Sequence, residues 1–142
     1  MRHLPLLIAI LATSACGPLR LSNLRDMRDR EKLNESAELF WMALRWSDLT
    51  AAASYYADPV QRMAWLEEQQ SGEAKRYRSA AVLQVNTTPL HEVDERGCVR
   101  EGGVIAQVEY YRMPTQVLVQ ELVPQKWCQA SGGNWFLLPE EE

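Results

Sequence analysis

The stretch GVIAQVEYYR, residues 103–112, alternates apolar and polar side chains in the manner of a β-strand with one buried face. Successive side chains of a strand point to opposite faces, so every second residue shares a face. One face comprises Val104, Ala106, Val108 and Tyr110, and the other comprises Gln107, Glu109 and Tyr111. The pattern predicts a strand of an antiparallel sheet whose apolar face packs on a core.

Similar runs flank this stretch on both sides. YRSAAVLQVNTT, residues 77–88, predicts an earlier strand that presents Ala81, Leu83 and Val85 on one side. QVLVQELVPQKWCQA, residues 116–130, predicts a long later strand with a bulge at Pro124, and WFLLP predicts the final arm. Turn residues separate the runs at residues 94–97, at Pro114 and at residues 131–134. Consecutive strands joined in this way predict an antiparallel meander.

Helical periodicity precedes the strands. Asn34 is predicted to cap a helix that runs to about residue 57. Its apolar face recurs at three- and four-residue spacings and comprises Leu39, Met42, Ala43, Trp46, Leu49, Ala53 and Tyr56, widened by Phe40 and Leu44. Asp58 and Pro59 begin a short second helix that closes near Gly72. Helices followed by a meander predict an α+β domain.

The N-terminus has the zones of a secretory signal. A basic start, a short apolar run and a small-residue end lead to Cys16. LATSAC, residues 11–16, resembles the lipobox of bacterial lipoproteins, in which the cysteine is diacylated and becomes the mature N-terminus; Thr13 departs from the usual aliphatic residue. We expect a signal peptide over residues 1–15 and a lipid on Cys16. The alternative is ordinary secretion with a plain thiol.

The lipobox resemblance also implies a location. In enterobacterial lipoproteins, Asp directly after the lipid-carrying cysteine retains the protein in the inner membrane, and Gly17 stands there in this chain. The resemblance therefore implies a lipid anchor in the outer membrane, with the protein on the periplasmic side. Two or more acyl chains suffice for stable anchoring.

Two further cysteines, Cys98 and Cys128, remain for pairing in an oxidising compartment. If the hairpin reverses near Pro114, opposite residues have numbers that sum to about 228, which places Cys98 across from about residue 130. A bulge at residues 102–103 accounts for the small offset from Cys128. We expect a disulfide; the alternative is two buried free thiols. A metal site is not expected, because neither cysteine belongs to a C-x-x-C unit.

The charge balance bears on partners. Nineteen Asp and Glu residues outnumber 15 Lys and Arg residues, and nucleic-acid binding is not expected because phosphate contacts need clustered cations. Basic residues do gather in residues 16–33, interleaved with acids. This segment is predicted to be a solvated tether or helical lead-in; attraction to anionic lipid head groups is the alternative. Residues 139–142 are predicted to be an acidic tail.

The order of elements resembles the nuclear transport factor 2-like family, whose cone-shaped fold ketosteroid isomerases also use. The residues that carry the likeness are ELFWMALRWSDLTAAASYYADP, residues 38–59, and QKWCQASGGNWFLLP, residues 125–139. The resemblance covers residues 34–138 and implies N-terminal helices packed on a curved antiparallel sheet. It includes no invariant active-site signature, so it carries little about activity.

The family's cone encloses a pocket between the first helix and the sheet. The residues expected there are Trp46, Tyr56, Tyr110 and Trp127, with an ordinary aromatic core as the alternative. Neither His91 nor Asp48 is expected to be catalytic, since His91 lies near a strand end and Asp48 opposite the apolar stripe. A partner-contact surface is expected where aromatic and basic residues fall off the helix stripes, at Trp41, Arg45, Arg62 and Trp65.

Two functions follow from these patterns. The first is a non-enzymatic, lipid-anchored cell-envelope protein, a scaffold or accessory subunit that binds a protein partner and needs no cofactor. The second is a pocket protein that binds a small apolar ligand or acts as a weak isomerase or hydrolase. A filled cone with an exposed aromatic patch favours the first, and an enclosed cavity with a perturbed ionisable group favours the second.

Overall fold

The computed structural model describes residues 19–140, in which helices precede strands. The helices are α1 (Leu19–Arg45), α2 (Leu49–Ala53) and α3 (Pro59–Gln69), and the strands are β1 (Arg76–Pro89), β2 (Cys98–Tyr111), β3 (Val119–Ala130) and β4 (Trp135–Leu137). The predicted α+β class is confirmed. The signal peptide, Cys16 and Gly17 lie outside the described residues.

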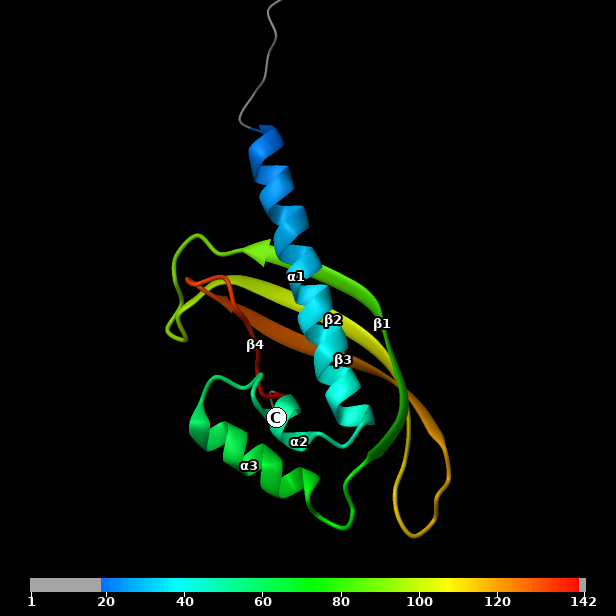
Figure 1. Ribbon diagram of the computed structural model, residues 1–142. Coiled ribbons are helices and arrows are strands. Elements are labelled where there is room, and N and C mark those ends of the chain that lie inside the picture. Colours follow the sequence, from blue (N-terminus) through cyan, green and yellow to red (C-terminus); the bar gives the residue numbers. More distant parts are fainter. Residues whose placement is uncertain (1–18, 141–142) are drawn as a thin grey trace, which may run out of the picture.

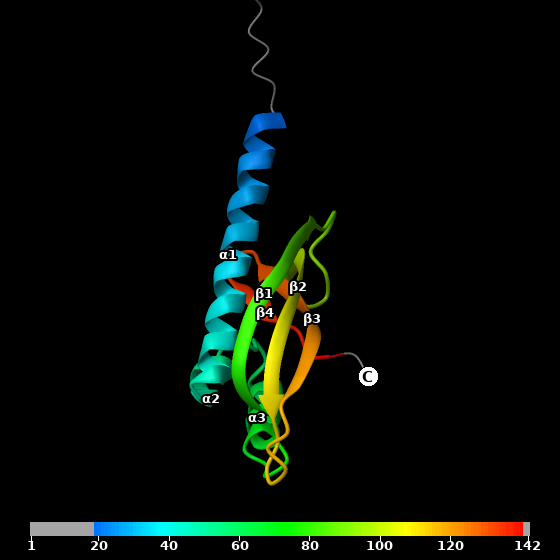
Figure 2. The same cartoon turned by 90° about the vertical axis from the view of Figure 1, so that its right-hand side faces the viewer.

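The strands form one antiparallel sheet in the order β1-β2-β3-β4, as the predicted meander requires. β2 lies between β1 and β3, and the short β4 pairs only with the last residues of β3. Figure 1 shows α1 running across one face of the sheet, with α2 and α3 near one end of it. Figure 2 shows the sheet from the side, curved and open, with α1 along one face.

The core lies between α1 and the sheet. The alternation of β2 is confirmed, because Val104, Ala106, Val108 and Tyr110 are all buried. β3 and β4 add Trp127, Trp135 and Leu137. The buried stripe of α1 recurs every three or four residues and comprises Leu33, Ala37, Phe40, Trp41 and Leu44.

The predicted bounds of the first helix are wrong at both ends. α1 already begins at Leu19, and Asn34 lies in its interior, where its side-chain amide donates to Glu38 Oε1 at 3.1 Å. The helix then stops at Arg45, because Ser47 has a left-handed backbone with φ of 59°. Asp48 caps the separate helix α2 by accepting the Ala51 N–H at 3.1 Å. The second predicted helix is confirmed as α3, capped by Asp58.

The predicted apolar face of α1 is also wrong in its first half. Leu39, Met42 and Trp46 are exposed on the side of the helix turned away from the sheet. Phe40 and Leu44, which were expected only at the margin of the face, are buried instead. The reason is that α1 carries two apolar stripes, and periodicity alone does not tell which one meets the sheet.

The predicted face of β1 is displaced by bulges. Ala81 and Leu83 are exposed, whereas Ala80, Val82 and Val85 pack against the core. The register shifts between Tyr77 and Ser79 and again between Val82 and Gln84. Each bulge adds a residue and moves the side chains that follow to the other face.

The bulges predicted for the second hairpin are wrong in position. Ile105 faces Pro124 in a register that is unbroken from Arg100 to Tyr110. Pro124 needs no bulge, because β4 pairs only with residues 127–129 and leaves one edge of β3 open at residue 124. The register shift lies instead between Cys98 and Arg100.

Gly102 lets helix and sheet approach closely. A Cβ atom there would collide with the side chain of Leu33 on α1 and would lie 2.9 Å from the ring of Trp135. Any larger residue at this position therefore requires α1 or Trp135 to move.

Candidate functional site

The space expected to be a pocket is filled by aromatic rings. Tyr56, Tyr110 and Trp127 are all buried, and Trp127 has no exposed surface. The ring of Trp127 lies edge-on to Phe40 and Tyr55, at centroid distances of 6.2 and 5.8 Å. These residues form a packed core between α1 and the sheet.

Trp46 lies outside this interior. Its side chain is 72% exposed beyond the end of α1, with the Arg45 guanidinium 5.9 Å from the ring centroid. The structure therefore does not bring Trp46 together with the other three predicted pocket residues.

The ionisable groups of the interior are tyrosines with raised pKa values. Burial raises the pKa of Tyr77 to about 12, and the nearby Glu121 carboxylate adds to this effect. Burial also raises the pKa of Tyr56, with a further contribution from Glu140. Both hydroxyls are therefore protonated and neutral at neutral pH.

The four predicted partner-contact residues do not form one exposed surface. Trp41 is 4% exposed and donates from Nε1 to Gln125 Oε1 at 3.1 Å, so its predicted exposure is wrong. Trp65 is half-buried beside Tyr56 at a centroid distance of 5.5 Å. Arg62 of α3 donates two hydrogen bonds, at 2.8 and 3.2 Å, to the carbonyl oxygen of Tyr56. These bonds connect α3 to the segment that precedes it. Arg45 is exposed.

An exposed apolar surface does exist on α1, at residues assigned to the core from sequence. We call Leu39, Met42 and Trp46 the outer patch; Leu39 and Met42 lie on the side of α1 that faces away from the sheet, and Trp46 follows directly after the end of the helix, four residues beyond Met42. The sequence signal was present, because this stripe is the one the periodicity picked out. The periodicity did not show that this stripe faces away from the sheet.

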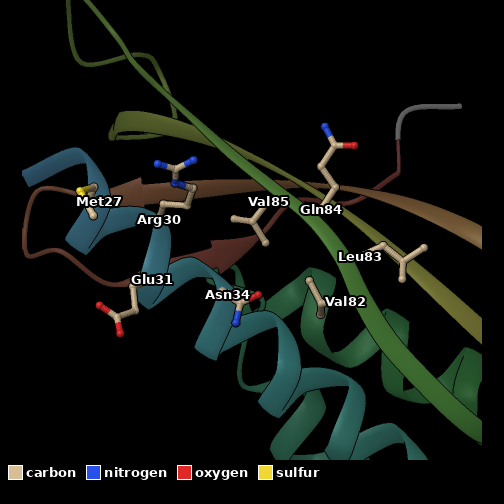
Figure 3. Close-up of a pocket in the computed structure, with 8 residues that line it drawn as sticks. All are labelled: Met27, Arg30, Glu31, Asn34, Val82, Leu83, Gln84 and Val85. Carbon is tan, nitrogen blue, oxygen red and sulfur yellow. The ribbon is translucent and has the colours of Figure 1, made fainter. Parts of the chain in front are cut away.

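A groove runs between α1 and β1 (Figure 3). It is open and has a volume of about 480 Å³. Its lining combines helix residues with a short stretch of strand: Met27, Arg30, Glu31, Asn34, Val82, Leu83, Gln84 and Val85. The two charged side chains of the lining, Arg30 and Glu31, point in different directions and do not converge on a common point (Figure 3).

A polar bracket joins the N-terminal half of α1 to the sheet. The nearly buried Arg100 of β2 donates from Nη1 to Asp26 Oδ1 at 2.7 Å, and its Nε lies 3.4 Å from Asp29 Oδ2. Gln129 of β3 donates to the other oxygen of Asp29 at 3.1 Å. Two carboxylates on successive turns of α1 thus face the sheet.

The predicted disulfide between Cys98 and Cys128 is confirmed, with a Cα–Cα distance of 5.4 Å. Cys98 pairs with Ala130, and Cys128 pairs with Glu101 on the facing strand. The disulfide therefore joins β2 to β3 diagonally across the hairpin, at the place where the register shifts.

Other sequence candidates lie on the surface. His91 is exposed in the loop between β1 and β2, and Asp48 is exposed at the cap of α2. Within residues 19–140, no group of three or more His, Cys, Asp or Glu side chains is placed to hold a metal ion. None of the helices described here has the length and apolar character to cross a membrane.

Comparisons with family models, with curated proteins and with solved structures found no match for this chain.

Proposed function

We propose that this chain is a non-enzymatic lipoprotein of the cell envelope that binds a protein partner as a scaffold or accessory subunit. In this proposal Cys16 carries the lipid, and the domain lies on the periplasmic side of the outer membrane. The nuclear transport factor 2-like resemblance belongs to the same proposal and stays a prediction.

The observation that carries the partner-binding part is the outer patch. A tryptophan that is 72% exposed, with Met42 one turn and Leu39 two turns before it, is unusual on a free surface. Tryptophan, methionine and arginine are enriched at protein interfaces, and Arg45 lies beside the Trp46 ring. A protein surface that buries the patch would remove this apolar area from water.

The interior supports a non-enzymatic role. The rings of Phe40, Tyr55 and Trp127 pack together between α1 and the sheet, where the resemblance would imply a pocket. Burial raises the pKa values of Tyr56 and Tyr77, which keeps both hydroxyls protonated, so neither serves as a general base at neutral pH.

The sequence supports the anchor. The lipobox-like residues 11–16 end at Cys16, and α1 begins three residues later, at Leu19. A lipid on Cys16 would thus be joined to the domain through a helix whose bracket to the sheet fixes its direction.

Photo-crosslinking in intact envelopes tests partner binding. We expect a crosslinkable amino acid in place of Met42 to capture one stoichiometric protein, and the same group in place of Gln107, an exposed residue of β2, to capture none. Trp46→Ser should weaken the capture at residue 42. Identical adducts from both positions, or no adduct from residue 42, would contradict partner binding through the outer patch.

Metabolic labelling tests the anchor separately. Cells grown with labelled palmitate should transfer label to this chain, and Cys16→Ser should abolish the transfer. An unlabelled chain with Cys16 intact would contradict the lipoprotein assignment.

A further inference from the structure

The first turns of α1 extend beyond the sheet (Figures 1 and 2). On them, Leu21 is 75% exposed and Leu24 is 60% exposed. Isolated exposed leucines are common, but these two lie three residues apart on one side of a helix end. They also lie at the end where the preceding chain, with Cys16, joins the domain.

The structure separates charges that are interleaved in the sequence. Arg100 and Gln129 hold Asp26 and Asp29 toward the sheet, at distances of 2.7 to 3.4 Å. A helix turns about 100° per residue. Residues on the far side therefore include Leu21 and Leu24 together with three cations, and we call this set the basic end: Leu21, Leu24, Arg25, Arg28 and Lys32.

The cations of the basic end are exposed, and within residues 19–140 Arg25, Arg28 and Lys32 make no ion pair. The acids that alternate with them in the sequence would otherwise weaken any attraction to an anion. With Asp26 and Asp29 turned to the sheet, the far side combines leucine and positive charge. This combination is typical of helices that rest on anionic membrane surfaces.

We propose that the basic end of α1 lies against a bilayer that contains anionic phospholipid. Leu21 and Leu24 enter the head-group layer, and the three cations face lipid phosphates. The proposal rests on the proposed lipid anchor, because a lipid on Cys16 places its acyl chains five residues before Leu21. It adds a second membrane contact, one that fixes the orientation of the domain.

The contact is confined to the first turns. Glu31 lines the groove beside β1, and the exposed Glu35 and Glu38 follow after the basic end, where an anionic surface repels them. The helix consequently leaves the bilayer at an angle. The outer patch, with Met42, stays in water and open to a protein partner.

A fluorescent probe tests this contact in the mature chain, purified and reconstituted into vesicles. Leu24→Cys carries nitrobenzoxadiazole, and Met42→Cys, on the same side of α1, carries it as the matched control. Cys98 and Cys128 are joined, so an acylated Cys16 leaves only the new thiol for labelling. Vesicles of phosphatidylglycerol with phosphatidylcholine are compared with phosphatidylcholine alone, and brominated lipid is the quencher.

We expect the probe at residue 24 to shift to the blue and to be quenched on the anionic vesicles only. Raising the salt to about 1 M, where the Debye length is about 3 Å, should reverse both effects. Arg25→Gln with Arg28→Gln should abolish them, since each cation near such a surface strengthens contact about five-fold. The probe at residue 42 should stay water-like throughout.

An unquenched probe at residue 24, or equal quenching on both vesicle types, would overturn the proposal. Equal quenching at residues 24 and 42 would also overturn it, because the bilayer would then cover the whole outer side of α1. The mass of the same sample reports whether Cys16 is acylated. If it is not, the proposed anchor fails, while the same two probes in a Cys16→Ser background, with vesicles added, still decide the lipid contact.

Discussion

At the scale of single residues, environment rather than residue type sets the behaviour of this chain. Five tyrosines are present, and burial raises the pKa of Tyr77 to about 12. Two tryptophans also differ in exposure: Trp41 is 4% exposed and Trp46 is 72% exposed. Gly102 matters only because Leu33 and Trp135 lie where its side chain would be. None of these differences can be read from the residue letter.

The raised tyrosine pKa values predict a loss of stability at high pH. Above the ordinary tyrosine pKa of about 10, the unfolded chain releases protons that Tyr77 retains in the folded chain. Stability should therefore fall as the pH rises from about 10 to 12. Tyrosinate absorbance and circular dichroism, followed together, should show Tyr77 ionising only as the chain unfolds.

Tyr77→Phe is the control for this titration and should remove one late-ionising group. Ionisation of every tyrosine in a single step near pH 10, with the circular dichroism unchanged, would contradict the prediction.

At the scale of elements, α1 illustrates why periodicity is an incomplete guide. Its two apolar stripes have the same spacing, and the sheet covers the one with Phe40, Trp41 and Leu44. The strand β2 was predicted correctly because it has only one apolar face. The position of β1 along the chain was predicted correctly, but the set of its side chains that face the core was not. The two bulges that set this face cannot be recognised from the alternation of apolar and polar residues. The helix was predicted to start at Asn34, with residues 16–33 as a tether or a helical lead-in; the sequence did not decide between these two, because Asp26 and Asp29 gain their partners only from β2 and β3.

Because one stripe of α1 is buried and the other is exposed, two tryptophan substitutions should change the free energy of unfolding by very different amounts. Trp41→Ala should lower the free energy of unfolding by about 3–5 kcal/mol, because it removes a buried ring that packs on Phe40 and Tyr77. Trp46→Ala should change it by at most about 0.5 kcal/mol. Urea denaturation followed by circular dichroism measures both.

Trp41→Phe separates packing from hydrogen bonding and should cost less than Trp41→Ala, because it keeps a ring but loses the bond to Gln125. Equal losses at positions 41 and 46 would show that the buried stripe has been assigned to the wrong side of α1.

At the scale of the whole molecule, long-range links hold the helix layer and the sheet in one arrangement. The Arg100 bracket joins α1 to β2 and β3, and the Leu137 N–H donates to the Tyr55 carbonyl oxygen at 2.8 Å. The disulfide closes the hairpin of β2 and β3 and joins residues that are 30 positions apart in the sequence. These links connect the helix layer, which carries the outer patch and the basic end, to the sheet.

The disulfide should contribute about 3–4 kcal/mol to the free energy of unfolding, from the closure of a loop of this length in the unfolded chain. Reduction, or Cys98→Ser with Cys128→Ser, should lower the urea midpoint by the corresponding amount. The reductant should have no effect on the double variant. A loss below about 1 kcal/mol would contradict a structural role for the bond.

The sequence by itself determined the class of fold, the meander order and the cysteine pairing. These follow from local signals: alternation in β2, turn residues between the strands, and register counted from Pro114. Only the tertiary structure decided which stripe of α1 is buried, where β1 turns its side chains and how the charges of residues 21–32 divide between two sides. Those outcomes depend on contacts between residues far apart in the chain, such as Asp29 with Gln129, and local patterns do not encode such contacts.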